Sequence, residues 1–190
     1  MHNISAVILA AGSGKRIGIP KLKLKHGENF FVNIIANKLK SEGINKIVCI
    51  IRKDDLDWFN ENTLGLEYII NNNAELGMVT SVKLGVERYN KQDGILLFPV
   101  DHPFVSCNTI GTMINNFGKY KDYVIKPNYK GKSGHPLIVP NSLFEHIISG
   151  DYSKTLNEII KETGIYDIKI DVDDEGILRN INSPDDLIIE

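Results

Sequence analysis

The sequence has little cysteine and no long apolar run. Its two cysteines, Cys49 and Cys107, stand far apart, with no C-x-x-C pair and no neighbouring histidine cluster. That spacing excludes a disulfide framework and a thiolate metal site. No apolar run approaches the roughly 20 residues that a membrane-spanning helix needs, and the N-terminus lacks the basic and apolar regions of a secretory signal. We therefore expect a reduced, cytoplasmic protein with no membrane partner.

Neither sign of charge prevails, because 22 Lys and Arg stand against 24 Asp and Glu, for a formal net charge of −2. This balance disfavours a nucleic-acid-binding module, which needs a clearly basic domain. With 42% hydrophobic and 24% charged residues, the composition is that of an ordinary globular protein and excludes a disordered chain. A domain typically takes roughly 100–200 residues, and no linker, repeat or low-complexity tract interrupts the chain. We predict one domain over residues 1–190.

Charge is nevertheless uneven along the chain. Residues 15–25 carry five bases and no acid, whereas residues 167–190 carry eight acids and two bases. Two solvated surfaces of opposite sign would explain this pattern. The basic cluster, however, directly follows an apolar run and a glycine loop, which is where anionic ligands bind in open α/β sheets.

Short apolar runs alternate with helical patterns over the first ~130 residues, which favours right-handed βαβ units and a mostly parallel sheet covered on both faces. We predict a three-layer α/β/α fold with a Rossmann-like sheet, and ligand-binding loops after Ala10, Ile70 and Val100. The predicted strands are 4–10, 46–51, 66–70, 94–100, 123–126, 137–139 and 165–170, with 129–134 as a polar connection. The predicted helices are 29–42, 54–62, 78–89, 109–117, 142–148 and 153–162, with a closing helix from Pro184 capped by Ser183.

The loop after the first predicted strand reads LAAGSGKRIGIPK over residues 9–21. It matches neither the P-loop nor the dinucleotide fingerprint, because Ile17 stands where each needs a glycine. It still meets the requirements of a phosphate site, since its glycines let backbone N–H groups approach an anion, Arg16 can fork onto phosphate oxygens and Lys21 supplies a point charge. A glycine turn with solvated lysines is the alternative, but this longer pattern at the end of a buried strand favours function.

The pattern L-A-A-G-x-G-x-R-x-G-x-P-K resembles the signature of the nucleotidyltransferases related to molybdenum cofactor cytidylyltransferases and guanylyltransferases. Further matches follow in order along nearly the whole chain. They are Asn71 with Gly-Met-Val-Thr-Ser-Val at 77–82, Val-Asp-His-Pro at 100–103, Gly-His-Pro at 134–136, and NINSPDDL at 180–187.

The resemblance implies a sheet of the nucleotide-diphospho-sugar transferase (GT-A-like) type and a reaction between a nucleoside triphosphate and a phosphorylated acceptor. The acceptor phosphate attacks the α-phosphate and pyrophosphate leaves, so cations and Mg²⁺ do most of the chemical work. The guanylyl branch usually has Gly where this chain has Ala11, and Gly-His-Pro is typical of the cytidylyl branch. We therefore expect CTP as donor and molybdopterin as acceptor, with possible transient contact with a molybdoenzyme.

The resemblance also implies the roles of individual residues. Arg16, Lys21 and Asp101 are the expected catalytic residues, with Asp101 also the Mg²⁺ ligand because a hard carboxylate at a strand end suits this ion. His102 and His135 are expected on the acceptor side. The expected nucleotide-binding residues are Leu9, Ala10, Ala11, Gly12, Ser13, Gly14, Arg16, Lys21, Asn71, Gly77, Thr80 and Ser81.

Several of these residues also have plain structural explanations. Asp101 could cap a turn, His102 could be a turn residue, and Asn71 could belong to a polar turn at a strand end. Thr80 and Ser81 could simply cap a helix, which does not exclude binding. His135 could fix the fold instead of contacting the acceptor, and as a metal ligand it has no partner at usable spacing.

One position departs from the family pattern. Asn182 stands where the family often has an aspartate, and related enzymes can use an acid there as a second metal ligand. Asparagine keeps an oxygen but lacks the charge, so a second carboxylate ligand is in doubt. The alternatives to the molybdopterin reaction are a guanylyltransferase, a cytidylyltransferase for methylerythritol phosphate or a sugar phosphate, and a nucleotide-binding relative without turnover.

Overall fold

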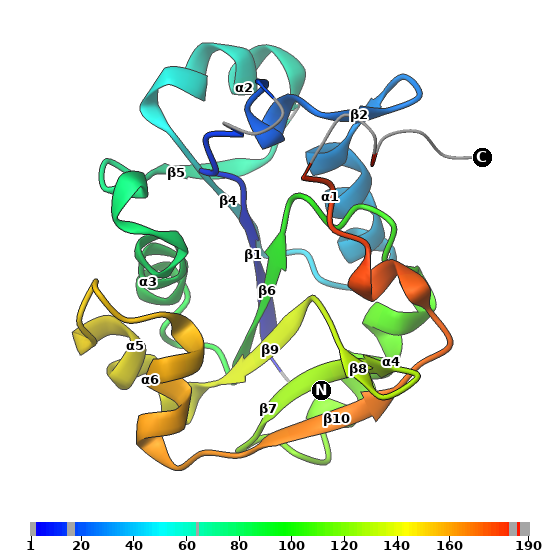
Figure 1. Ribbon diagram of the computed structural model, residues 1–190, viewed down its shortest axis with the longest axis vertical. Coiled ribbons are helices and arrows are strands. Elements are labelled where there is room, and N and C mark those ends of the chain that lie inside the picture. The colour runs from blue at the N-terminus through cyan, green and yellow to red at the C-terminus, as the bar shows by residue number, and fades with distance from the viewer. Residues whose placement is uncertain (1–2, 15–17, 64, 183–185, 187–190) are drawn as a thin grey trace.

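The computed structural model describes residues 3–14, 18–63, 65–182 and 186. A central eight-stranded sheet lies between two layers of helices (Figure 1). Its strands are β1 (Ile4–Leu9), β4 (Ile47–Ile51), β5 (Glu67–Ile70), β6 (Gly94–Pro99), β7 (Val124–Tyr129), β8 (Lys132–Ser133), β9 (Leu137–Pro140) and β10 (Asp167–Asp171). The helices are α1 (Phe31–Ser41), α2 (Leu56–Asn62), α3 (Met78–Arg88), α4 (Cys107–Phe117), α5 (Phe144–Ser149) and α6 (Leu156–Thr163).

Two apolar cores hold the layers together, one on each face of the sheet. Successive side chains of a strand point to opposite faces, so Ala6 and Ile8 of β1 pack in the core under α1 and α4, whereas Val7 and Leu9 pack under α3, α5 and α6. Because both faces are covered, the central strands are mostly apolar and do not alternate, although β1 also buries the polar Ser5. This confirms the predicted three-layer α/β/α fold.

The strand order is β10-β7-β9-β6-β1-β4-β5, with β8 paired to β7. β1 is parallel to both β4 and β6, and β4 is parallel to β5. Strands β4 and β5 lie on one side of β1 and β6 on the other, so the order reverses at β1. Ligands bind outside the carboxyl ends of the strands at such a reversal.

The second half of the sheet departs from the simple βαβ pattern. β9 is antiparallel to both β6 and β7, whereas β10 is parallel to β7. The predicted strand at 123–126 continues through Pro127 to Tyr129, and part of the predicted connection 129–134 forms β8. The sheet remains mostly parallel, as predicted, but its antiparallel insertion was not predicted.

Several short elements also went unpredicted. A two-stranded ribbon joins β2 (Lys25–His26) to β3 (Asn29–Phe30), and 3₁₀ turns cover Lys21–Lys23, Lys53–Asp55, Ala74–Leu76, Asn141–Leu143 and Glu175–Leu178. The predicted closing helix falls outside the described residues except at Asp186. None of the helices in the described part of the chain is long and apolar enough to cross a membrane.

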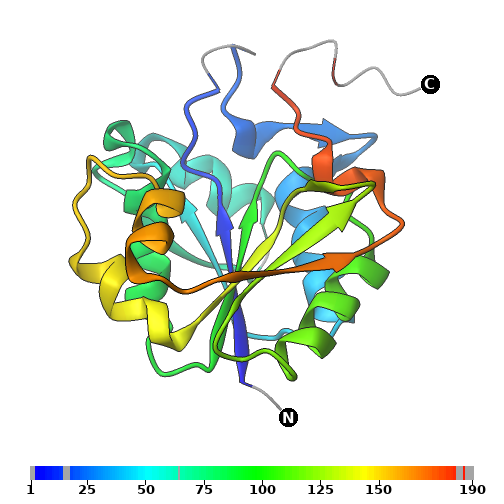
Figure 2. The same ribbon diagram turned by 60° about the horizontal axis from the view of Figure 1, so that its bottom comes forward.

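The register of the strands brings distant loops to one edge of the sheet. Leu9 lies opposite Ile50 of β4 and Pro99 of β6, and backbone hydrogen bonds continue past the strand ends, from Val100 N to Leu9 O at 3.1 Å and from Asn71 N to Ile51 O at 2.8 Å. Figure 2 shows the blue chain after β1 and the red C-terminal segment rising from this same edge.

Candidate active site

A cavity of about 140 Å³ opens at the carboxyl ends of β1 and β6. The three loops that were expected to bind ligand meet there. It is lined by Leu9, Ala11, Gly12, Lys21, Ala74, Gly77, Met78, Ser81, Pro99, Val100 and Asp101. Six of the predicted nucleotide-binding residues and the predicted metal ligand are therefore gathered around one space, which we call the nucleotide cavity.

The remaining predicted residues lie around this lining or beneath it. Ala10 is fully buried under the cavity, and Thr80 is buried in the first turn of α3. Ser13 and Gly14 belong to the loop but not to the lining. Arg16 lies outside the described residues, so its role stays a prediction.

Gly14 folds the first loop back on itself. Its φ is +61°, and a Cβ atom there would lie 1.8 Å from the carbonyl oxygen of Ile19. Gly18 N donates to Gly14 O at 2.9 Å, which closes the turn. Only glycine allows this close backbone approach, and the fold-back returns the chain to the cavity at Lys21.

The ammonium of Lys21 lies between two oxygens from distant parts of the chain. Its Nζ donates to Oδ2 of Asp101 and, at 2.7 Å, to Oδ1 of Asn182. The Asn182 backbone N–H donates in turn to the Asp186 carboxylate at 2.8 Å. The first loop, the end of β6 and the C-terminal segment are thus joined by one side chain.

Asp101 is held in its ionised form. Burial alone raises the pKa of its carboxyl, but the hydrogen bonds from His102 and Lys21 outweigh burial and the pKa lies below its ordinary value. Because an ionised carboxylate only accepts, His102 Nδ1 carries the proton and donates to Asp101 Oδ1 at 2.9 Å. Asp101 is therefore a fixed negative charge at the edge of the nucleotide cavity.

The two predicted acceptor-side histidines lie against each other. The ring centroids of His102 and His135 are 4.8 Å apart, at an interplanar angle of 61°. Burial, together with the neighbouring His102, lowers the pKa of His135 to about 4, so its ring is neutral near pH 7. Its Nδ1 is buried and has no hydrogen-bond partner among the described residues. Their separation in sequence gave no sign that these rings would touch.

Asn71 supports the cavity from below. Its Nδ2 donates to the hydroxyls of Thr80 and Ser81, each at 2.8 Å, and its Oδ1 accepts from Asn73 N at 2.9 Å. Both amide hydrogens are thereby used within the protein. Asn71 positions the first turn of α3, whereas Ser81 also lines the cavity.

Sequence reasoning did not single out Ala74, Met78, Pro99 and Val100 as site residues, although they line the nucleotide cavity. Met78 belongs to the Gly-Met-Val-Thr-Ser-Val block, which was the available signal. Ala74 carries no such signal, because its place depends on the 3₁₀ turn before Gly77.

The protein offers few metal ligands at this edge. Within the described ranges, no group of three or more His, Cys, Asp and Glu residues is arranged to hold a metal ion. One carboxylate and one amide oxygen, from Asp101 and Asn182, already converge on a cation, the ammonium of Lys21. Mg²⁺ typically binds through one or two carboxylates together with substrate phosphates, so this set of donors fits that ion.

Comparison with known proteins agrees with this geometry. The model of the MobA-like NTP transferase domain matches residues 6–166. The chain belongs to this family. The protein is therefore a nucleotidyltransferase of the MobA-like type, and its family includes relatives named as guanylyltransferases and as cytidylyltransferases.

The chain is similar to three curated proteins. A probable molybdenum cofactor guanylyltransferase of Natranaerobius thermophilus is 24% identical and aligns with 97% of this chain and 93% of its own length. The 2-C-methyl-D-erythritol 4-phosphate cytidylyltransferase of Clostridium beijerinckii is 25% identical over 62% of this chain and 55% of its own. The bifunctional protein GlmU of Staphylococcus haemolyticus is 31% identical over 59% of this chain, which spans only 25% of GlmU.

Solved structures share the fold of this MobA-like chain. Rv0371c of Mycobacterium tuberculosis superposes with a TM-score of 0.80 at 18% identity, covering 97% of this chain and 95% of its own. Its manganese complex has a TM-score of 0.73 at 17% identity, covering 90% and 89%. At these identities the likeness shows the fold alone.

Proposed function

We propose that the chain acts as one nucleotidyltransferase domain, residues 1–190, that transfers CMP from CTP to molybdopterin and releases pyrophosphate. The observation that carries this proposal is that Lys21 donates hydrogen bonds to both Asp101 and Asn182, beside a cavity formed by the first loop and α3. A positive side chain and backbone N–H groups there suit a triphosphate more than a neutral ligand, and an ionised carboxylate suits the divalent cation that accompanies a triphosphate. The reaction would take place in the cytoplasm, with transient transfer to a molybdoenzyme.

In the nucleotide cavity, backbone groups and side chains would bind different parts of the nucleotide. Ala11 and Gly12 would present backbone groups to the base and phosphates, and the first turn of α3 after Gly77 would offer the N–H groups of a helix N-terminus. Lys21 holds a phosphate oxygen once the triphosphate draws it away from Asp101. Arg16 is proposed as the second phosphate-binding cation.

The proposed cofactor is Mg²⁺, held by the Asp101 carboxylate and the Asn182 amide oxygen. When bound, it would neutralise the charge that develops on the transferred phosphoryl group. His102 keeps Asp101 oriented through its Nδ1 hydrogen bond. The manganese complex of the structurally similar Mycobacterium tuberculosis protein supports a divalent ion in this fold.

The base assignment rests on Ala11 and on the Gly-His-Pro segment at 134–136, both of which are typical of the cytidylyl branch. The test is incubation with Mo-molybdopterin, Mg²⁺ and each of the four nucleoside triphosphates in turn, with pyrophosphate release as the readout. We expect release with CTP. Absence of release with CTP would overturn the proposal.

A guanylyltransferase is the second candidate, because the relative that aligns with 97% of the chain is named as one. A cytidylyltransferase for methylerythritol phosphate is favoured by the C. beijerinckii relative, which aligns with 62%. Pyrophosphate release with GTP and molybdopterin, or with CTP and methylerythritol phosphate, would identify these reactions in the same assay.

A further inference from the structure

The strand β10 forms one edge of the central sheet (Figure 1). It pairs with β7 on its inner side, and no strand in the described part of the chain pairs with its outer side. Such an edge presents a row of backbone N–H and C=O groups that can pair with another chain. The outer side of this strand, which we call the β10 edge, is therefore a candidate docking surface.

The hydrogen bonds to β7 show which backbone groups of β10 face outward. Val124 N donates to Tyr166 O at 3.2 Å, and Val172 N donates to Asn128 O at 2.9 Å. Because successive residues of a strand point their backbone groups to alternate sides, the even-numbered residues of β10 bond to β7 and the odd-numbered residues face away from it. The outward-facing N–H and C=O groups belong to Asp167, Lys169 and Asp171.

The side chains of β10 follow the same alternation. The strand reads Asp-Ile-Lys-Ile-Asp over residues 167–171, with the charged side chains exposed and the isoleucines half-buried. Ile168 and Ile170 pack on the core under α1 and α4, and the alternation places Tyr166 on this same face. Tyr166 is 76% exposed, and tyrosine is enriched in protein interfaces. The β10 edge thus has one face of alternating charge and one apolar face.

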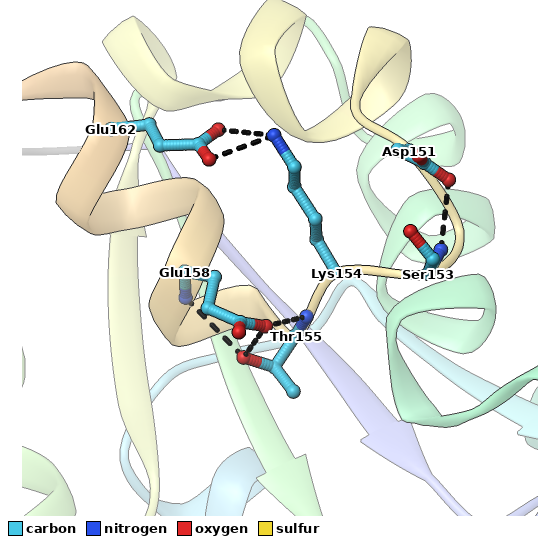
Figure 3. A network of polar contacts seen from close by, with 6 residues as sticks. All are labelled: Asp151, Ser153, Lys154, Thr155, Glu158 and Glu162. Atoms are coloured by element: carbon cyan, nitrogen blue, oxygen red, sulfur yellow. Dashed lines mark hydrogen bonds and ion pairs between the residues drawn. The ribbon is translucent and has the colours of Figure 1, made fainter.

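The segment that leads into β10 is held in place by polar contacts. It comes from α6, where the Thr155 hydroxyl and the Glu158 carboxylate form a capping box (Figure 3). Lys154 Nζ also contacts both carboxylate oxygens of Glu162, at 2.7 and 2.8 Å. The β10 edge is therefore ordered before any partner arrives, which reduces the entropy lost on association.

The helices leave room for a second copy of the chain at the β10 edge. On the apolar face, α4 packs on β7. If two copies of β10 pair, their β7 strands lie three strand spacings apart, which is about 14 Å at ~4.8 Å per spacing. Packed helices need about 8–10 Å between their axes, so the two α4 helices do not collide.

The charges of β10 distinguish between the registers in which two copies can pair antiparallel. Outward-facing groups meet when the two-fold axis lies at position 168, 169 or 170. An axis at 169 places Lys169 opposite itself and Asp167 opposite Asp171, and an axis at 170 places Asp167 opposite Asp173, so like charges meet, which is unfavourable. An axis at 168 places Asp167 of each copy opposite Lys169 of the other. The charges are self-complementary in that register.

We propose that the chain forms a homodimer through the β10 edge, in which β10 pairs antiparallel with β10 of a second copy about a two-fold axis at Ile168. The charged face then contains two ion pairs, each between Asp167 of one copy and Lys169 of the other. On the apolar face, Ile168 meets its own counterpart and Tyr166 lies opposite Ile170, so the exposed tyrosine ring is covered. Cross-strand pairs of both kinds stabilise a sheet.

The homodimer leaves both nucleotide cavities open. β10 runs parallel to β1, because β6 is parallel to β1 and the two antiparallel steps through β9 and β7 restore the direction. Antiparallel pairing therefore points the carboxyl edges of the two sheets, and the nucleotide cavities there, in opposite directions. The homodimer does not depend on the proposed nucleotidyl transfer.

The test is sedimentation velocity of the full chain over about a hundredfold range of protein concentration, in which the unmodified chain should shift from monomer to dimer. Asp167→Lys and Lys169→Asp each create two pairs of like charge in the dimer, and each should raise its dissociation constant at least about tenfold. The double variant exchanges the two signs and should dimerise as the unmodified chain does. Asp173→Lys is the matched control, since it makes the same change of charge at an exposed position after the strand.

The two single variants also check each other. Asp167→Lys removes a contact with Lys126 Nζ at 3.6 Å within one copy, whereas Lys169→Asp leaves that contact intact, so equal effects report the contact between copies. Thermal unfolding of each variant separates lost pairing from lost folding. The inference is overturned if the unmodified chain stays monomeric, if either single variant dimerises as well as the unmodified chain, or if the double variant fails to recover.

Backbone hydrogen exchange tests the pairing of the strands directly. The N–H groups of Asp167 and Lys169 should exchange more slowly as protein concentration rises, because they become hydrogen-bonded in the dimer. The N–H groups of Ile168 and Ile170, which face β7, should change less. A dimer that protects neither Asp167 nor Lys169 would use another surface and would contradict the inference.

Discussion

At the scale of single residues, the charge balance of the candidate site rests on one ion pair at the edge of the sheet, between Lys21 and Asp101. Lys21 and Asp101 neutralise each other in the absence of ligand, and Asn182 adds an oxygen without adding charge. With an aspartate at position 182, as the family often has, two carboxylates would face one ammonium. The asparagine therefore lets one lysine balance the local charge.

Loss of either charge should abolish most of the activity and spare the fold. Lys21→Ala removes the proposed phosphate-binding cation and Asp101→Ala removes the proposed metal ligand, and each should lower kcat at least about a hundredfold, as expected for charge-stabilising groups. Lys25→Ala is the control, because Lys25 is exposed and lies over the Phe30 ring. Turnover near that of the unmodified chain in either test variant would contradict the assigned roles.

A negative charge at position 182 should strengthen divalent-ion binding before any nucleotide is present. Asn182→Asp places a second carboxylate beside Asp101, and affinity for hard cations rises with the charge of the ligands. We expect Mn²⁺ to bind about tenfold more tightly, measured by electron paramagnetic resonance of the free ion. Asn180→Asp is the matched control, since it adds the same charge at an exposed position of the same segment. Equal affinities in the two variants would argue against Asn182 as a ligand.

At the scale of elements, the site is made by the ends of strands and by the turns that follow them. β1 and β6 end side by side, and the loop after β1 folds back at Gly14 so that Lys21 faces Asp101. The first turn of α3 is fixed from β5 through Asn71. The shape of these loops is set by the strands beneath them.

Alanine substitutions at two glycines of the first loop distinguish the cost of backbone strain from the cost of a steric clash. Gly14→Ala should weaken CTP binding at least about tenfold, because the new Cβ would lie 1.8 Å from the Ile19 carbonyl oxygen and the turn must open. Gly18→Ala has a comparable positive φ of +77° but no atom within 4 Å of the new Cβ, so it should show the conformational cost alone. Isothermal titration of both variants with CTP and Mg²⁺ makes the comparison, and equal affinities would count against the fold-back.

At the scale of the whole molecule, the sequence was sufficient to predict the strands and helices whose residue pattern is local and periodic. The buried runs around β1, β4 and β6 and the helical faces of α1 and α3 were placed within one or two residues. The ribbon of β2 and β3 was missed, since strands of two residues leave no periodicity. The antiparallel direction of β9 was missed because it depends on partners that are distant in sequence.

The same distinction explains what could be predicted of the site. The first loop and Asp101 were recognisable because each motif is continuous in sequence. The contact between Lys21 and Asn182 joins residues 161 positions apart, and the contact between the His102 and His135 rings likewise exists only after folding. The second cavity, which lies beside the nucleotide cavity, is lined by side chains from several segments that are distant in sequence, so no single motif revealed it.

The buried histidine should make the stability of the molecule depend on pH. The pKa of His135 is about 4 in the folded chain and about 6.5 when unfolded, so between these values the unfolded chain binds the additional proton. The contribution of the neutral His135 ring to the free energy of unfolding is fully present above about pH 6.5. As the pH falls toward 4, the free energy of unfolding decreases by on the order of 3 kcal/mol. Urea unfolding from pH 7 to pH 4 measures this loss.

The variant His135→Asn should show a smaller decrease in unfolding free energy over this range, whereas His146→Asn, at an exposed position, should behave as the unmodified chain does. Parallel pH dependence of His135→Asn and the unmodified chain would mean that other groups are responsible.

The residues shared by the nucleotide cavity and the cavity beside it also limit which substitutions can change one cavity alone. Met78 lines both the nucleotide cavity and a second cavity, of about 290 Å³, beside it, so a substitution there changes the shape of both cavities at once. Independent change has to come from residues that line only one of the two cavities, such as Ala11 or Tyr152. A change at such a position should therefore alter one cavity and leave the shape of the other as it is.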